Sequence, residues 1–349
     1  MEHLDDVLDA VVSMRVKTST LVALFAMSPL LLSVFLGFKS YEVWPQITYL
    51  WRVGANPITE LVQTDPHALR FALIYPILGI AETLGVDHDT LFTAVLLCVC
   101  FLTIQTMNRI IGSIVMAPRN PVTIQVITAT ILVFLFFFMN GRIGFAFLGY
   151  SILLLVVVRH HYQREFKVFS FIALFIGFAL CSVSSGTLAS AAFVVFLAIY
   201  FEAFRSIRRR SLTRSGLALF LSCFAVGLIL SRFVLVGIQQ NISYYGGGSE
   251  GFLRMLEHGF GSALYPILHA LGLPLVVSLM VGTGLLFSLL LARMPHSLLA
   301  HLILSAIACG AFGYSTLSLA ALPLIALAAV VIASRGKYLA QCEAASSRG

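Results

Sequence analysis

The chain has 349 residues, of which 59% are hydrophobic and only 11% charged, and its mean hydropathy is +0.98. This composition excludes a water-soluble globular domain and indicates a polytopic membrane protein. The formal net charge of +7 would suit nucleic acid in a soluble protein, but in a membrane protein basic residues mark cytoplasmic loops, so no nucleic-acid partner is expected.

The N-terminal residues 1–18 are predicted to form an amphipathic cytoplasmic segment lying on the membrane surface. Its apolar residues recur at helical spacing, at Leu4, Val7, Leu8 and Val11. Because the segment is acidic, it differs from the basic start of a secretion signal. The first hydrophobic run is therefore expected to be retained as a membrane helix.

Ten apolar runs are long enough to cross a membrane, or nearly so. They cover residues 19–38, 89–107, 122–138, 143–158, 168–184, 187–204, 216–236, 273–292, 298–313 and 317–334. Two further stretches are ambiguous, because 69–85 carries charges and a central Pro76, and 262–271 is too short to cross. The sequence predicts an all-α polytopic membrane protein with about ten transmembrane helices in one integral domain, residues 1–349.

The distribution of Lys and Arg indicates the topology. If only the ten runs cross, sixteen of the 22 basic residues fall on one side and six on the other. If 69–85 crossed as well, the arginine-rich residues 205–214 would move outward, against the positive-inside bias. We therefore expect both termini in the cytoplasm, and two large outer loops, 39–88 and 237–272, that contain juxtamembrane helices.

The outer basic residues are candidate ligands for an anion. Arg142 lies in a short turn between two apolar runs, where its side chain either reaches lipid headgroups or grips a phosphate with its planar guanidinium. The outer loops also hold carboxylates and imidazoles suited to general acid/base chemistry. The predicted substrate-binding residues are Arg142, Arg70, Arg232, Arg254, Tyr244 and Tyr245, and the predicted catalytic residues are Glu42, Glu257 and His258.

The second outer loop contains YYGGGSEGFLRMLEHGF, residues 244–260. Its three consecutive glycines allow a sharp bend, and residues 250–260 are expected to form a short helix that brings Arg254, Glu257 and His258 within about one turn. This loop is the candidate for a lid. The glycines are not followed by the Gly-Lys-Ser/Thr of a P-loop, and the sequence has no His/Cys cluster at metal-ligand spacing, so no cofactor is expected.

The pattern of the first half resembles a known family. A long outer loop begins with the aromatic-rich SYEVWPQITYLW, residues 40–51, and a later helix starts at Asn140-Gly141-Arg142. This arrangement, over roughly residues 19–205, resembles the EpsG/Wzy-like polysaccharide polymerases, which are related to the GT-C class of membrane glycosyltransferases. Ile143 stands where many members have a glutamine, and Tyr41 and Glu42 stand where many have an aspartate.

The resemblance implies that the chain polymerises or transfers polyprenyl-diphosphate-linked oligosaccharide at the outer face of the bacterial inner membrane. Arginines would neutralise the diphosphate leaving group, and a carboxylate or histidine would take the proton of the acceptor hydroxyl. The implied partners are the lipid-linked glycan, membrane lipids, and a chain-length regulator or other glycan assembly proteins. Two alternatives stay open: a lipid or solute transporter or flippase, and a noncatalytic subunit of a glycan assembly complex.

Overall fold

The computed structural model describes residues 2–52, 69–114, 121–138, 141–163, 168–183 and 242–260, with a few isolated positions between 191 and 239. These ranges are helices joined by turns and short irregular segments, and they contain no strand, which confirms an all-α fold for this part of the chain. The five predicted spans from residue 187 onward, and the stretch 262–271, lie outside these ranges or at the isolated positions.

Five apolar helices coincide with the first five predicted spans. They are α1 (Glu2–Phe35), α5 (His88–Ile114), α6 (Pro121–Phe138), α7 (Gly141–Gln163) and α8 (Val168–Cys181). Among the described residues, three segments are long and apolar enough to cross a membrane, namely Thr18–Phe35, His88–Ser113 and Gly141–His160. The apolar parts of α6 and α8 are shorter.

The first helix differs from the prediction at its N-terminal side. Instead of a separate helix on the membrane surface, residues 2–17 continue directly into the apolar segment, so that α1 is one helix of 34 residues. At 1.5 Å per residue this helix is about 51 Å long, well beyond a hydrocarbon core of about 30 Å. Pro29 lies inside it without ending it.

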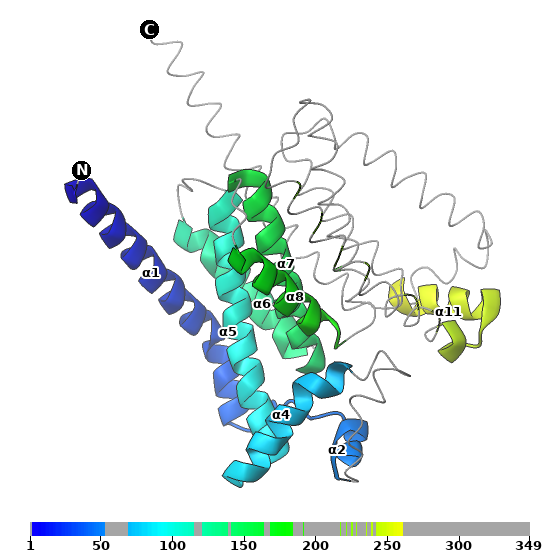
Figure 1. Cartoon of the computed structure of the whole chain (residues 1–349). Coiled ribbons are helices and arrows are strands. Elements are labelled where there is room, and N and C mark those ends of the chain that lie inside the picture. Colours follow the sequence, from blue (N-terminus) through cyan, green and yellow to red (C-terminus); the bar gives the residue numbers. More distant parts are fainter. Residues whose placement is uncertain are drawn as a thin grey trace.

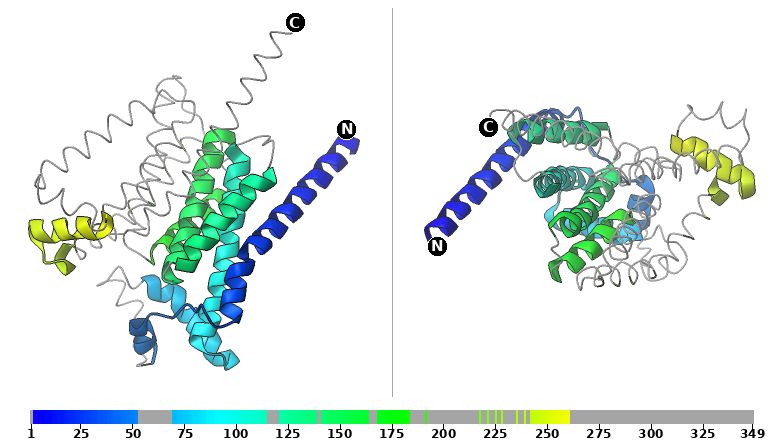
Figure 2. Two further views of the ribbon diagram at one scale, coloured as in Figure 1. Left: turned by 180° about the vertical axis from the view of Figure 1, so that it is seen from behind. Right: turned by 90° about the horizontal axis from the view of Figure 1, so that it is seen from above.

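The helices of the bundle alternate in direction (Figure 1). α5 packs against α1, α6 and α7, while α7 also packs against α8 and α1 along α6. In the apolar segment of α7, 78% of the residues are buried, compared with 44% in α5 and 22% in α1. α7 is therefore the most buried of these three helices, and the view from above in Figure 2 places α1 at the edge of the bundle.

Two glycines allow α7 and α8 to approach closely. A Cβ atom added to Gly149 would lie 2.5 Å from the carbonyl oxygen of Gly177 and 2.7 Å from the Cβ of Leu180. A Cβ added to Gly177 would lie 2.8 Å from Leu153 Cδ2. Small residues at such a crossing let two backbones meet, which is how membrane helices gain packing contacts in the absence of a hydrophobic drive between them.

A polar cluster links α1 to α5. The Ser19 hydroxyl donates to Gln105 Oε1 at 3.0 Å, and Asn108 Nδ2 donates to Ser19 Oγ at 3.0 Å. Gln105 Nε2 also donates to the Ser19 carbonyl at 3.3 Å. Hydrogen bonds between membrane helices each contribute about 1 kcal/mol, so this cluster helps to hold a helix that is otherwise little buried.

Two short helices cover the end of the bundle at which α5 and α7 begin, here called the pocket end. α2 (Pro45–Arg52) and α4 (Leu69–Leu84) pack against each other, with the rings of Trp51 and Tyr75 edge to face at 5.1 Å. Figure 1 shows α4 lying obliquely across the start of α5. The ambiguous stretch 69–85 is thus a helix of about 24 Å at the end of the bundle, where a juxtamembrane helix of the first loop is expected.

We expect Gly149→Ala to destabilise the folded bundle by about 1–3 kcal/mol, because its methyl group meets backbone that cannot rotate away. Gly112→Ala is the matched control: Gly112 is also a helical glycine, but nothing lies within 4 Å of its added Cβ. That change should be neutral or stabilise by up to about 1 kcal/mol. Thermal unfolding in detergent measures both, and equal midpoints for the two variants would contradict the close crossing.

Candidate functional site

The segment that joins α1 to α2, residues 39–44, is not helical, so its backbone needs partners elsewhere. It finds them on the helices at the pocket end. The Tyr41 amide donates to Thr93 Oγ1 at 2.9 Å, and the Val43 amide donates to Asp89 Oδ1 at 2.7 Å. The Tyr41 hydroxyl donates to the carbonyl of Phe136, the last turn of α6, at 2.5 Å.

These bonds fix which side chains of the joining segment face outward. Tyr41 and Val43 are buried, whereas the alternate residues Glu42 and Trp44 are exposed, as in any extended segment that lies on a surface. Burial raises the pKa of the Tyr41 hydroxyl, with a smaller contribution from Cys100, so this group stays a neutral donor. The segment therefore presents one carboxylate and one indole outward.

The first residue of α7, Gly141, has no room for a side chain. A Cβ on Gly141 would lie 2.6 Å from Leu96 Cδ1, 2.8 Å from Phe92 Cε1 and 3.2 Å from Tyr41 Cβ. α7 thus begins in direct contact with α5 and with the joining segment. This contact sets the position of the next residue, Arg142.

Two cations are held over aromatic rings at this point. The guanidinium carbon of Arg142 lies 4.3 Å from the centroid of the Trp44 ring. Lys39 Nζ lies 4.7 Å from the Tyr41 ring centroid and 5.9 Å from that of Phe137. Cation–π contacts of this kind hold a positive group in a fixed position over a ring.

A first pocket, here called the cationic pocket, opens beside these cations. It has a volume of about 350 Å³ and is lined by Lys39, Ser40, Tyr41, Glu42, Val43, Trp44, Pro45, Phe138 and Gly141. Arg142 is not one of the lining residues, but it follows Gly141 and stacks on Trp44, which both line the pocket. Lys39 balances Glu42 within the lining, and Arg142 beside it makes the charge of this region net positive.

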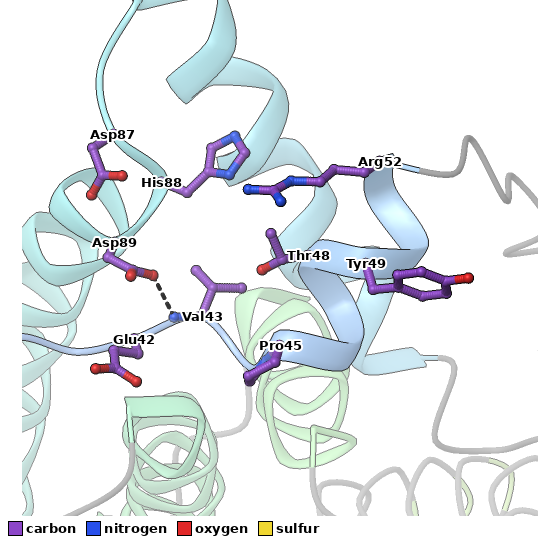
Figure 3. A pocket seen from close by; sticks show the side chains of 9 residues that line it. All are labelled: Glu42, Val43, Pro45, Thr48, Tyr49, Arg52, Asp87, His88 and Asp89. Carbon is purple, nitrogen blue, oxygen red and sulfur yellow. Dashed lines mark hydrogen bonds between the residues drawn. The ribbon is translucent and has the colours of Figure 1, made fainter.

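A second pocket, here called the polar pocket, adjoins the first (Figure 3). It has a volume of about 340 Å³ and is lined by Glu42, Val43, Pro45, Thr48, Tyr49, Arg52, Asp87, His88 and Asp89. Glu42, Val43 and Pro45 line both pockets, so the joining segment is their common wall. The Glu42 side chain is therefore accessible from two sides.

Several groups of the polar pocket are fixed by structural bonds. Asp87 Oδ2 accepts from the Thr90 amide at 3.1 Å and caps the start of α5. His88 Nε2 lies 3.6 Å from Glu82 Oε1, which also accepts a bond of 2.6 Å from the indole of Trp51. The polar wall formed by α5 is thus rigidly tied to α2 and α4.

The structure places the predicted residues of the first loop and of α7 together. Glu42 lines the cationic pocket, and Arg142 stacks on Trp44, which lines the same pocket. Arg70 lies in α4, where only the backbone is described, and Arg232 lies outside the described residues. The predicted pairing of Arg142 with Arg70 or Arg232 therefore stays a prediction.

The predicted residues of the second loop lie on or beside α11 (Gly248–Phe260), which agrees with the helix expected for residues 250–260. Arg254 pairs with Glu250 one turn earlier, with 2.5 Å between Nη2 and Oε1. The rings of Tyr244 and Tyr245 contact each other at 5.1 Å, and Tyr244 is exposed. Glu257 and His258 belong to α11, but the description covers only their backbone.

α11 is tied to the preceding turn through its glycines. Gly246, Gly247 and Gly248 have φ of 116°, 76° and 57°, a conformation that favours glycine, and the Gly247 amide donates to the Ile242 carbonyl at 2.9 Å. Figures 1 and 2 show α11 to one side of the bundle, and Arg254 is not among the lining residues of either pocket. The lid stays a prediction.

Sequence reasoning did not single out four residues that the geometry adds to the site. Lys39, Trp44, Arg52 and His88 line the pockets, although Lys39 and Arg52 were two of the six predicted outer basic residues and His88 was one of the outer imidazoles. The alternation of buried and exposed positions from Tyr41 to Trp44 is the signal that could have found Trp44. Lys39 and Arg142 are more than a hundred residues apart in sequence, and only the fold brings them together.

Comparison of the chain with protein-family models, with curated proteins and with solved structures finds no match. What the site can do must therefore be argued from its own geometry. A cationic pocket and a polar pocket that share one accessible carboxylate can hold an anionic group beside a group that gives up a proton.

We expect Tyr41→Phe to lower the free energy of unfolding by about 1–3 kcal/mol, because the buried Phe136 carbonyl loses its donor. Tyr49→Phe removes the same atom from an exposed side chain and is the matched control, with an expected change within about 0.5 kcal/mol. Thermal unfolding in detergent measures both variants. Equal stability of the two would show that the joining segment is not held by this bond.

Proposed function

We propose that the chain is a membrane glycosyltransferase of the polysaccharide polymerase type, acting on polyprenyl-diphosphate-linked oligosaccharide. The observation that carries the proposal is a pair of cations held over aromatic rings: Lys39, which lines the cationic pocket with the exposed carboxylate of Glu42, and Arg142, which stacks on the lining residue Trp44. Diphosphate requires concentrated positive charge, and glycosyl transfer requires a base for the acceptor hydroxyl. Both requirements are met within this pocket.

We place the pocket end at the outer face of a bacterial inner membrane, with ten spans and both termini in the cytoplasm. Sixteen of the 22 Lys and Arg residues then lie on the cytoplasmic side. The alternating directions of α1, α5, α6, α7 and α8 support the order of the first five spans. They bring residues 39–44 and the start of α7 to one end of the bundle, as this topology requires.

In the proposed reaction, Lys39 and Arg142 bind the diphosphate oxygens of the donor. The acceptor hydroxyl oxygen attacks the anomeric carbon, and Glu42 takes its proton. The bond between the anomeric carbon and the diphosphate oxygen breaks, and its electron pair stays on the diphosphate, where the two cations stabilise the charge. The products are one longer glycan on the acceptor lipid and one free polyprenyl diphosphate.

The topology can be tested with single cysteines in a background without the native ones. We expect Ser40→Cys and Ser249→Cys to react with an impermeant thiol reagent added to intact cells, since the exposed side chains of Ser40 and Ser249 belong to the two outer loops. Ser211→Cys, in the arginine-rich cytoplasmic loop, should react only after permeabilisation. Labelling of all three from the same side would end the ten-span topology.

The role of Arg142 can be tested by substitution. We expect Arg142→Ala to lower glycan polymerisation by about one to two orders of magnitude, because a desolvated contact between arginine and phosphate contributes about 1.5–3 kcal/mol. Arg142→Lys should restore activity only in part, because an ammonium keeps the charge and loses the planar fork. Polymer length and yield in membranes that contain each variant are the readouts.

The control is Arg159→Ala, an exposed arginine near the other end of the same helix. Binding of a synthetic polyprenyl diphosphate to the purified chain separates the alternatives. Normal polymerisation in Arg142→Ala would leave Arg142 as a residue that reaches lipid headgroups. Binding without any glycan product would favour a transporter. If every pocket variant keeps both binding and product, a noncatalytic subunit would be favoured.

A further inference from the structure

We propose that the polar pocket is a carbohydrate subsite, which holds the sugar hydroxyls of the acceptor beside the diphosphate in the cationic pocket. This assignment of a ligand class rests on the proposed function, because it takes the cationic pocket to be the diphosphate site.

The charge of the polar pocket excludes a second phosphate. The pocket is lined by three carboxylates, those of Glu42, Asp87 and Asp89, and by one guanidinium, that of Arg52. The cationic pocket has the opposite balance. Because like charges repel more strongly where water is partly excluded, an anion is directed to the cationic pocket and a neutral ligand to the polar one.

A divalent cation is not the better ligand for these carboxylates. Among the residues that the structure describes, no group of three His, Cys, Asp or Glu side chains is placed to hold a metal ion. Asp87 and Asp89 are also engaged, since one oxygen of each accepts a backbone amide. Each keeps a second carboxylate oxygen, which suits a single hydroxyl donor.

The remaining groups match a ligand with many hydroxyls. A hydroxyl both donates and accepts, so its site needs acceptors and donors side by side. Figure 3 shows Arg52 and Thr48 pointing from α2 toward His88 and Asp89 on α5, while the ring of Tyr49 points away. Carboxylate acceptors on one wall thus face guanidinium and hydroxyl donors on the other. The volume of about 340 Å³ falls at the small end of ligand pockets.

The position of Glu42 connects the two pockets. Glu42 lines both of them, and Figure 3 shows its carboxylate at the edge of the polar pocket, directed away from Arg52 and His88, so it lies at the boundary between a hydroxyl bound in the polar pocket and a diphosphate in the cationic pocket. A base placed between acceptor and leaving group is what the proposed transfer requires. The polar pocket is formed by α2 and the start of α5, because these are the elements next to the joining segment that carries Glu42.

The test uses the purified full chain in detergent and two probes. The first is a panel of neutral monosaccharides (glucose, galactose, N-acetylglucosamine and rhamnose) at millimolar concentrations, with binding detected by saturation-transfer NMR. The second is a polyprenyl diphosphate that carries no sugar. We expect Arg52→Gln to weaken binding of at least one sugar about tenfold or more, because a charged hydrogen bond to it is lost, and to leave diphosphate binding within about twofold.

The matched control is Arg159→Gln, the same change of an exposed arginine far from the pockets. It should alter neither probe. Lys39→Gln should show the reverse of Arg52→Gln, with diphosphate binding weakened and sugar binding kept. Thr48→Val keeps the shape of the side chain and removes its hydroxyl. If Arg52→Gln fails to fold, this variant tests sugar binding in the polar pocket instead.

The outcomes separate this inference from the proposed function. If no sugar of the panel binds, or if sugar binding survives both Arg52→Gln and Thr48→Val, the carbohydrate subsite is wrong even where diphosphate still binds. If Arg52→Gln also abolishes diphosphate binding, the two pockets form one anion site and the inference is overturned. If sugar binds through Arg52 but diphosphate does not bind at all, the subsite stands and the proposed polymerase function fails.

Discussion

The site depends on how one non-helical segment satisfies its backbone at the end of a helix bundle. Residues 39–44 cannot use helical hydrogen bonds, and in or near a membrane an unpaired amide costs several kcal/mol. The amides of Tyr41 and Val43 use side chains of α5, and the Tyr41 hydroxyl reaches the end of α6. These bonds turn Glu42 outward, bring Trp44 under Arg142 and form the wall between the two pockets. Without these bonds, the joining segment would not hold Glu42 and Trp44 in the positions that form the two pockets.

The helices of the first half were predictable because hydropathy is a local signal. Runs of about twenty apolar residues must be helical in lipid, and five of them appear at the expected positions. The junction of residues 2–17 with the first span was not predicted correctly. An amphipathic pattern specifies a helix with one apolar face, but it does not specify whether that helix bends away from the next one. In the structure no break separates the two segments.

The site was predictable only in part, for the same physical reason. Arg142 stood out because a charge between two apolar runs is costly unless it has a use, and Glu42 because it is one of the carboxylates of the first outer loop. The relation of Arg142 to Trp44 depends on a contact between segments some one hundred residues apart, which no local pattern contains. The opposite holds for Arg254, whose partner Glu250 lies one helical turn away and could be read from the spacing. Local pairs follow from sequence, whereas the assembly of a pocket follows from the packing of α7 against α5.

The unbroken length of α1 has a mechanical consequence. Residues 2–17 extend the helix by about 24 Å beyond the apolar segment that begins at Thr18, and a helix is stiff over that distance. A rod of this kind transmits a sideways force at its tip to the membrane-embedded part, with the tip acting as the long arm of a lever. Because α1 is little buried and ends next to the joining segment, a load on the N-terminal tip would act first on the wall between the two pockets.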